Sequence, residues 1–258
     1  MQAMNIDMKR WISFLLALSF SSVMTAGERT IELNVTGQPP LNASDQMSFM
    51  DEVTKEALRR IGYNLKTVQL PAERGLVNAN KGKVDGEMSR VKGIDKIYNN
   101  LVRVPEKIMD WEFVAFSKEG DCSNQGWAAL SGKNIAHING WKIFEKNVPS
   151  TAEITKTSNS MELFTLLKKG RADLVLYERW GGHYILNEMG MNNVNRCMPA
   201  LAVKEMFIYL HKKNKSIVKK LAAALAMMKQ DGSYQKLFNQ YLLPFQDSPD
   251  SKNKSPIN

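Results

Sequence analysis

Two stretches of the sequence repeat one pattern of residue types, and each leads to a charged side chain. Gly82–Arg90 reads GKVDGEMSR and Gly170–Arg179 reads GRADLVLYER, so a glycine, a basic residue, a small residue and an aspartate follow one another in both. Five residues after the aspartate, the first copy carries Arg90 and the second carries Glu178. Arginine can hold a carboxylate through two parallel hydrogen bonds, and glutamate can accept from an ammonium group. The pair therefore predicts a site for opposite charges of one small ligand. The alternative is two ordinary surface charges at strand ends.

The elements around these copies alternate between strand and helix patterns. We expect strands at Arg29–Gly37, Asn64–Leu70, Asp110–Lys118, Asn134–Ile138 and Ala200–Lys213. We expect helices at Phe49–Ile61, Ala72–Gly82, Ser158–Gly170, Gly181–Gly190, Ser216–Gly232 and Ser233–Leu242. Such alternation predicts an α/β fold with mainly parallel sheets. Ligands of such sheets bind beyond the carboxyl ends of the strands, which is where the two repeated stretches place their charged residues.

Further residues are candidates for lining a ligand site. Arg74 lies at the start of a helix, where it either points to the ligand or is a solvated charge. Gly140 and Trp141 open another helix, whose free N–H groups suit an anion, although Trp141 suits a core position equally well. The remaining candidates flank the repeated strands or begin a helix: Glu87, Tyr177 and Ser158, the last of which is also typical of a helix cap.

The first 26 residues are typical of a secretion signal. Lys9 and Arg10 precede the apolar stretch Trp11–Phe20, which is too short to span a membrane as a helix, and small residues follow it. We therefore expect cleavage near Ala26 and a periplasmic location. A buried N-terminal helix is the alternative.

Charge and cysteine content narrow the class of partner. The formal net charge of +9 is spread along the chain, without the clustered basic stripe that nucleic-acid binding needs. An exported chain with two cysteines, Cys122 and Cys197, favours a disulfide between them. His137, His183 and His211 are isolated from the cysteines and from one another, so we expect neither a metal site nor a cofactor.

Taken in order, these elements resemble family 3 of the bacterial extracellular solute-binding proteins, the periplasmic type that binds polar amino acids. The resemblance rests on the ordered set GKVDG, LSGKNIAHINGW, LLKKGRADLVLYE and DGSYQKLF, and it covers residues 28–243. It implies a type II periplasmic-binding-protein fold: two lobes, each a mainly parallel sheet flanked by helices, joined by two crossover strands. Lobe 1 is expected at residues 27–115 and 204–246 and lobe 2 at 116–203, followed by a polar tail without structure at 247–258. Both cysteines then fall within lobe 2.

The resemblance also implies a function. A monomer would capture a small charged or zwitterionic, amino-acid-like solute between its lobes, close around it by a hinge motion, and deliver it to an ABC-type permease or a sensor in the inner membrane. Glu178 stands where relatives use an aspartate to hold the α-ammonium group. The arginine that relatives carry further along lobe 1 is missing, since Ile97 is near that position, and Arg90 is the nearest replacement.

Two alternatives belong to other functional classes. Some relatives are enzymes, such as dehydratases, but catalysis would need a paired acid and base, and Glu178 has no second acid or histidine at a matching spacing. We therefore expect no enzymatic activity. A ligand sensor that acts through a membrane partner is the other alternative.

Overall fold

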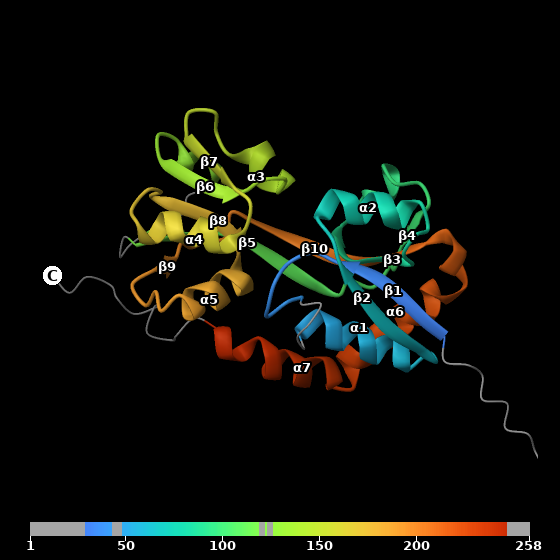
Figure 1. Ribbon diagram of the computed structural model, residues 1–258. Helices are drawn as coiled ribbons and strands as arrows, with labels where there is room; N and C mark the ends of the chain where they lie inside the picture. The colour runs from blue at the N-terminus through green and yellow to red at the C-terminus, as the bar shows by residue number, and fades with distance from the viewer. Residues whose placement is uncertain (1–28, 43–47, 119–121, 123–125, 247–258) are drawn as a thin grey trace, which may run out of the picture.

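The structure is a computed structural model that describes residues 29–42, 48–118, 122 and 126–246 of the 258-residue chain. The expected signal segment and polar tail lie outside these residues. Two groups of strands and helices lie on either side of two long strands, β5 (Met109–Ser117) and β10 (Ala202–His211), which run between them (Figure 1). The expected two-lobed architecture with two crossover strands is therefore confirmed, whereas the residue bounds of the lobes stay a prediction.

One sheet connects both lobes, in the strand order β2-β1-β3-β10-β5-β8-β6-β7. Its lobe 1 strands are β1 (Arg29–Val35), β2 (Tyr63–Gln69) and β3 (Gly86–Val91), and its lobe 2 strands are β6 (Asn134–Ile138), β7 (Glu153–Thr157) and β8 (Leu174–Glu178). The short strands β4 (Leu101–Arg103) and β9 (Asn195–Arg196) pair with β10 and β5. Within each lobe the central strand, β1 or β6, is parallel to both neighbours, whereas β5 and β10 are antiparallel to theirs. Each lobe is therefore built on mainly parallel strands, as expected.

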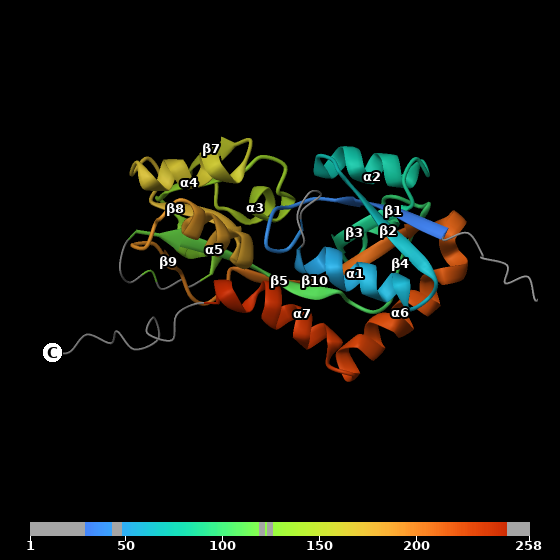
Figure 2. The same ribbon diagram turned by 60° about the horizontal axis from the view of Figure 1, so that its bottom comes forward.

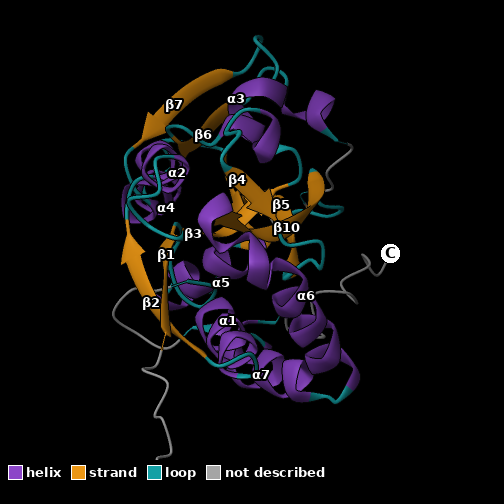
Figure 3. Cartoon of the chain, turned by 90° about the vertical axis from the view of Figure 1, so that its right-hand side faces the viewer, coloured by secondary structure: helices purple, strands orange, loops and turns teal. Residues whose placement is uncertain are grey.

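Helices cover both faces of the sheet in each lobe. Lobe 1 has α1 (Phe49–Arg59), α2 (Ala72–Asn80) and α6 (Lys215–Gln230), and lobe 2 has α3 (Lys142–Asn147), α4 (Ser160–Lys168) and α5 (Arg179–Glu188). The alternation of β1 explains the layers of lobe 1. Leu33 packs with Phe49 of α1 and Leu221 of α6, whereas Asn34 points to the opposite face, which α2 covers. Figure 3 shows α1 and α6 together on one side of this lobe.

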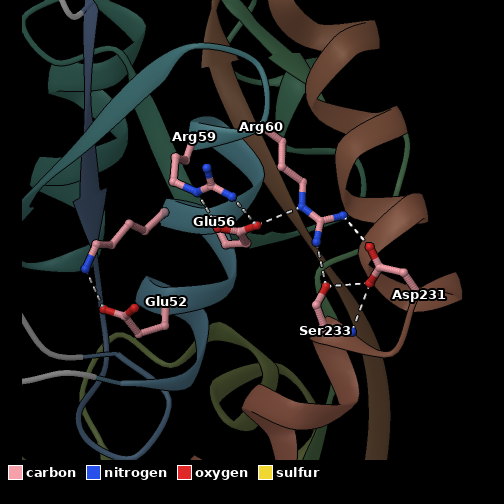
Figure 4. Close-up of polar contacts among 7 residues, drawn as sticks. Glu52, Glu56, Arg59, Arg60, Asp231 and Ser233 are labelled. Carbon is pink, nitrogen blue, oxygen red and sulfur yellow. Dashed lines mark hydrogen bonds and ion pairs between the residues drawn. The ribbon is translucent and has the colours of Figure 1, made fainter.

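The last helix, α7 (Ser233–Tyr241), runs beneath both lobes (Figure 2). The ring of Phe238 lies 5.8 Å from Phe49 of lobe 1 and 5.6 Å from Trp180 of lobe 2, between ring centroids. Arg60 anchors its start through Asp231, at 2.6 Å, and Ser233, at 2.9 Å (Figure 4). The C-terminal helix therefore contacts both lobes.

Cys122 and Cys197 form a disulfide, as expected, with their Cα atoms 4.9 Å apart. The bridge joins positions 75 residues apart in the sequence, so it removes many conformations from the unfolded chain.

We predict that the double variant Cys122→Ser/Cys197→Ser loses about 2–5 kcal/mol of unfolding free energy. Urea unfolding of the oxidised protein and of the variant measures this difference. Adding a reductant should lower the stability of the wild type to that of the variant and leave the variant unchanged. Equal stability of variant and oxidised protein would contradict the prediction.

Candidate functional site

The repeated glycine–basic–small–aspartate pattern has the same structural role in both lobes. The N–H of Asp85 donates to the carbonyl of Glu32, at 2.7 Å, and the Asp85 carboxylate accepts from the N–H of Glu32, at 2.9 Å. Asp173 makes the same two hydrogen bonds with Asn134, both at 2.8 Å. Each aspartate thereby ties the strand that follows it to the central strand of its lobe.

Arg90 and Glu178 consequently occupy equivalent positions in the two lobes, near the carboxyl ends of β3 and β8. The strands β10 and β5 lie between them in the sheet. The shared role of the aspartate explains why the glycine–basic–small–aspartate pattern occurs twice, since the aspartate fastens a strand in each lobe. The different charges that follow are free to serve different purposes.

Arg90 is held firmly within lobe 1. Its Nη2 lies 2.6 Å from Glu87 Oε2 and donates to Thr36 Oγ1, at 2.9 Å, and to the carbonyl oxygen of Ala72, at 3.1 Å. Only 13% of the side chain is exposed. Among the described residues, the Arg90 side chain makes polar contacts only through Nη2, and its Nε is buried without a partner. Of the five N–H donors of this guanidinium, the three on Nε and Nη1 are therefore available.

The ion pair between Arg90 and Glu87 was not predicted from the sequence. Residues three apart on a regular strand point to opposite faces. Here Arg90 lies opposite Phe207 and Glu87 lies opposite Tyr209, so β3 advances three residues where β10 advances two, and the extra residue lies in β3. The register shift lets both charged side chains point to the face covered by α2.

Glu87, a candidate ligand-lining residue, is instead the partner that orients Arg90. It is 1% exposed, and its two oxygens accept from Asn34 Nδ2 at 3.0 and 3.1 Å. Burial raises the pKa of the Glu87 carboxyl, against the opposing effects of Arg90 and Asn34. A Cβ on Gly75 would lie 2.0 Å from Asn34 Nδ2, so α2 packs this closely because residue 75 has no side chain.

Glu178 caps the helix that follows it. Its carboxylate accepts from the N–H of Trp180, at 2.8 Å, and from the N–H of Gly181, and the residue is 4% exposed. Burial raises the pKa of Glu178 to about 8, although the two N–H groups and the charge of Arg179 lower it. The sequence analysis did not predict this capping role.

The raised pKa of Glu178 predicts a pH-dependent stability. Between its ordinary value of 4.5 and about 8, the folded protein holds a proton that the unfolded chain has lost. The stability contribution of Glu178 is therefore complete below pH 4.5 and is lost as the pH rises to about 8. We expect at least about 2 kcal/mol, because a tenfold change in proton affinity corresponds to about 1.4 kcal/mol.

Urea unfolding of wild type and Glu178→Gln between pH 5 and pH 9 tests this, since the two proteins differ only at residue 178. The variant loses part of the cap, so its stability is lower throughout, but the difference between the two proteins should shrink as the pH rises. A constant difference would contradict the raised pKa.

Aromatic side chains of lobe 2 surround the other candidates. Trp141 stacks on Tyr177, with ring centroids 4.7 Å apart, and lies 6.5 Å from Trp111. Tyr177 is buried, which raises the pKa of its hydroxyl, whereas Trp141 is half-buried. Tyr177 is therefore a core residue, and Trp141 has both a core contact and an exposed part. Gly140 is exposed in the turn before α3, with φ +83° and an N–H that donates to Glu145.

The last two candidates lie on the surface. The N–H and hydroxyl of Ser158 both donate to Glu162, at 3.0 and 2.8 Å, and the neighbouring Asn159 accepts from the N–H of Glu162 as the N-cap of α4. Ser158 thus belongs to the helix cap. Arg74 is exposed on α2, one residue before the close-packed Gly75.

A contact between the lobes was missed from the sequence. Ser160, the first residue of α4, donates to Gln38 Oε1 of lobe 1. Gln38 lies two residues after Thr36, the partner of Arg90. Arg90 therefore lies close to the point where the lobes meet.

Comparisons with known proteins identify the fold. No family model matches the sequence. An uncharacterized protein of Shewanella oneidensis is 24% identical over 212 residues, which cover 79% of this chain and 80% of that protein. Among solved structures, the GluR0 ligand-binding core in complex with L-glutamate has a TM-score of 0.74 at 14% identity and covers 84% of this chain and 99% of its own. The chain has the two-lobed fold of periplasmic binding proteins.

Two further solved structures have the same fold. A mutant of ArgBP from T. maritima has a TM-score of 0.68 at 18% identity and covers 82% of this chain and 94% of its own. A histidine kinase sensor domain with similarity to periplasmic binding proteins has a TM-score of 0.68 at 17% identity. The match covers 83% of this chain and 96% of that domain. The resemblance found in the sequence is thus confirmed in the architecture.

Two further properties of the described residues concern other classes of site. Within those ranges, no group of three or more His, Cys, Asp or Glu side chains is placed to hold a metal ion. No helix in the parts of the chain that the structure describes combines the length and apolar character needed to span a bilayer.

Proposed function

We propose that this chain is a periplasmic solute-binding protein in which Arg90 holds the anionic group of a small ligand between the lobes. The main observation that supports this proposal is how the Arg90 side chain is held. The buried Glu87 and the half-buried Thr36 and Ala72 fix it through Nη2, while Nε is buried without a partner. A buried donor without a partner costs about 1–3 kcal/mol, and a ligand oxygen at this point would remove that penalty.

Rigid anchoring suits a binding site. Glu87 and Thr36 hold the guanidinium in place before a ligand arrives, so little conformational freedom is lost on binding. The neighbouring Gln38–Ser160 contact supports a site between the lobes, because ligand contacts there would add to an existing closed contact. Trp141 and Gly140 are the lobe 2 residues that we place near the ligand.

The solved structures support the ligand class in general terms. One is a core complexed with L-glutamate, and another is described as the substrate-binding protein of an amino acid ABC transporter. Delivery to an inner-membrane permease, export by the N-terminal segment, action as a monomer and the absence of catalysis are parts of this proposal.

A thermal-shift screen tests the proposal. The panel contains amino acids, dicarboxylates, monocarboxylates, short peptides and, as cationic controls, polyamines. A ligand at one hundred times its dissociation constant stabilises by about 2.7 kcal/mol, which corresponds to a rise in Tm of about 5–10 °C for a protein of this size. We expect such a rise for members that carry an anionic group and none for polyamines.

Arg90→Ala alone would leave Glu87 buried without its cation, which destabilises a fold strongly. The screen therefore compares Glu87→Gln with Arg90→Ala/Glu87→Gln. The shift should persist in the first variant and disappear in the second. Arg59→Ala is the matched control, because this arginine is 69% exposed on α1 and pairs only with Glu56 of the same helix among the described residues. Equal shifts in all variants, or no shift with any compound, would refute the proposal.

A sensory role is the second candidate. The similarity to a histidine kinase sensor domain favours it, at a TM-score of 0.68. Deleting the gene separates the two roles: a transport protein is needed for uptake of the labelled ligand, whereas a sensor is needed for the transcriptional response to it.

A further inference from the structure

We infer, on the basis of the proposed function, that the ligand is an organic anion without an ammonium group beside its carboxylate, and not an α-amino acid. The negative charge of the ligand is inferred from Arg90, whose three N–H donors on Nε and Nη1 have no partner among the described residues. A planar guanidinium with available donors is well suited to a carboxylate.

An ammonium group has no partner at the equivalent point of lobe 2. The Glu178 carboxylate accepts from two backbone N–H groups at the start of α5, and the residue is 4% exposed. The raised pKa of Glu178 agrees with this geometry, because a protonated carboxyl group does not attract a cation. Glu178 is therefore a helix cap rather than a receptor for a positive charge.

The two residues also cannot meet the two charges of one amino acid. Arg90 lies opposite Phe207 in the sheet, Glu178 lies opposite Phe113, and Phe113 lies opposite Ala202. The offset is thus five residues along β10 and three strand spacings across the sheet, or about 20 Å between backbones. Each side chain is tied to its own lobe, whereas the two charges of an α-amino acid are attached to one carbon atom.

The contacts that lead from Arg90 into lobe 2 run through uncharged side chains among the described residues. They pass from Thr36 along the chain to Gln38 and across to Ser160 at the start of α4. Glu87, the nearest carboxylate, is already used by Asn34 and Arg90. An ammonium group on the ligand would lose its hydration here without gaining an anionic partner.

Titration calorimetry at pH 7.5 with matched pairs of compounds tests the inference. Each pair joins an amino acid to the acid that lacks only the amino group: phenylalanine with 3-phenylpropionate, aspartate with succinate, glutamate with glutarate. We expect the acid of at least one pair to bind at least about tenfold more tightly than its amino acid, a difference of about 1.4 kcal/mol. Its affinity should be lost in Arg90→Ala/Glu87→Gln and unchanged in Arg59→Ala.

The outcomes separate this inference from the proposed function. If an amino acid binds more tightly than its partner acid and needs Arg90, the inference is wrong and the proposed function stands. The same holds if Glu178→Gln weakens the binding of an amino acid. If neither member of any pair binds, or if binding does not need Arg90, both are wrong.

Discussion

Replacing Gly86 with alanine is expected to lower the free energy of unfolding by about 4 kcal/mol or more. Gly86 follows Asp85 in the first repeated stretch and lies between β1 and β10. A Cβ there would lie 2.0 Å from the carbonyl oxygen of Tyr209 and 3.0 Å from the Cα of Leu210. Both are backbone atoms of β10, the crossover strand, so relief would require the sheet to shift. The second copy carries Leu174 at this point, where no such approach occurs.

Gly62→Ala is the matched control for this prediction. Gly62 has φ +80° but no atom within 4 Å of an added Cβ, so alanine there costs only the left-handed backbone conformation, about 1 kcal/mol. Urea unfolding measures both variants. Should Gly86→Ala be no less stable than Gly62→Ala, the close approach of β3 and β10 would be incorrect.

The second large effect concerns binding. In the Glu87→Gln background, removing the Arg90 side chain is expected to weaken binding of an anionic ligand at least about a hundredfold, because hydrogen bonds to charged groups contribute about 1.5–3 kcal/mol each. Titration calorimetry with a ligand from the screen measures this change. Arg90→Lys in the same background should not restore the affinity, since an ammonium group lacks the planar set of donors that contacts Thr36 and a carboxylate at once. An affinity within threefold of the background in either variant would contradict this prediction.

Local patterns were sufficient to predict most of the elements and the repeated pattern, although the strands β4, β7 and β9 were missed. The predicted strand Asn134–Ile138 is β6 without change, and β5 and β10 differ from their predictions by one or two residues at each end. The repeated stretches do occupy equivalent places, because the aspartate in each makes two backbone hydrogen bonds that any such βαβ unit can use. These features depend on residues that are close in sequence or on a regular period.

The details of the site depend on irregularities and distant contacts. The Glu87–Arg90 pair needs the irregular pairing of β3 with β10, in which β3 carries one extra residue. The contact between Gln38 and Ser160 joins positions 122 residues apart, and no period relates them. The capping role of Glu178 depends on the approach of Gly181, where a Cβ would lie 2.2 Å from the carboxylate oxygen. A pattern of residue types contains none of this information.

A crystal structure with the tightest ligand of the screen tests the central claim most directly, because it places the ligand relative to Arg90. The account predicts an anionic oxygen of the ligand at about 2.7–2.9 Å from Nε or Nη1 of Arg90, with Glu87 still bound to Nη2. A ligand bound elsewhere, with Nε of Arg90 still unpaired, would contradict it.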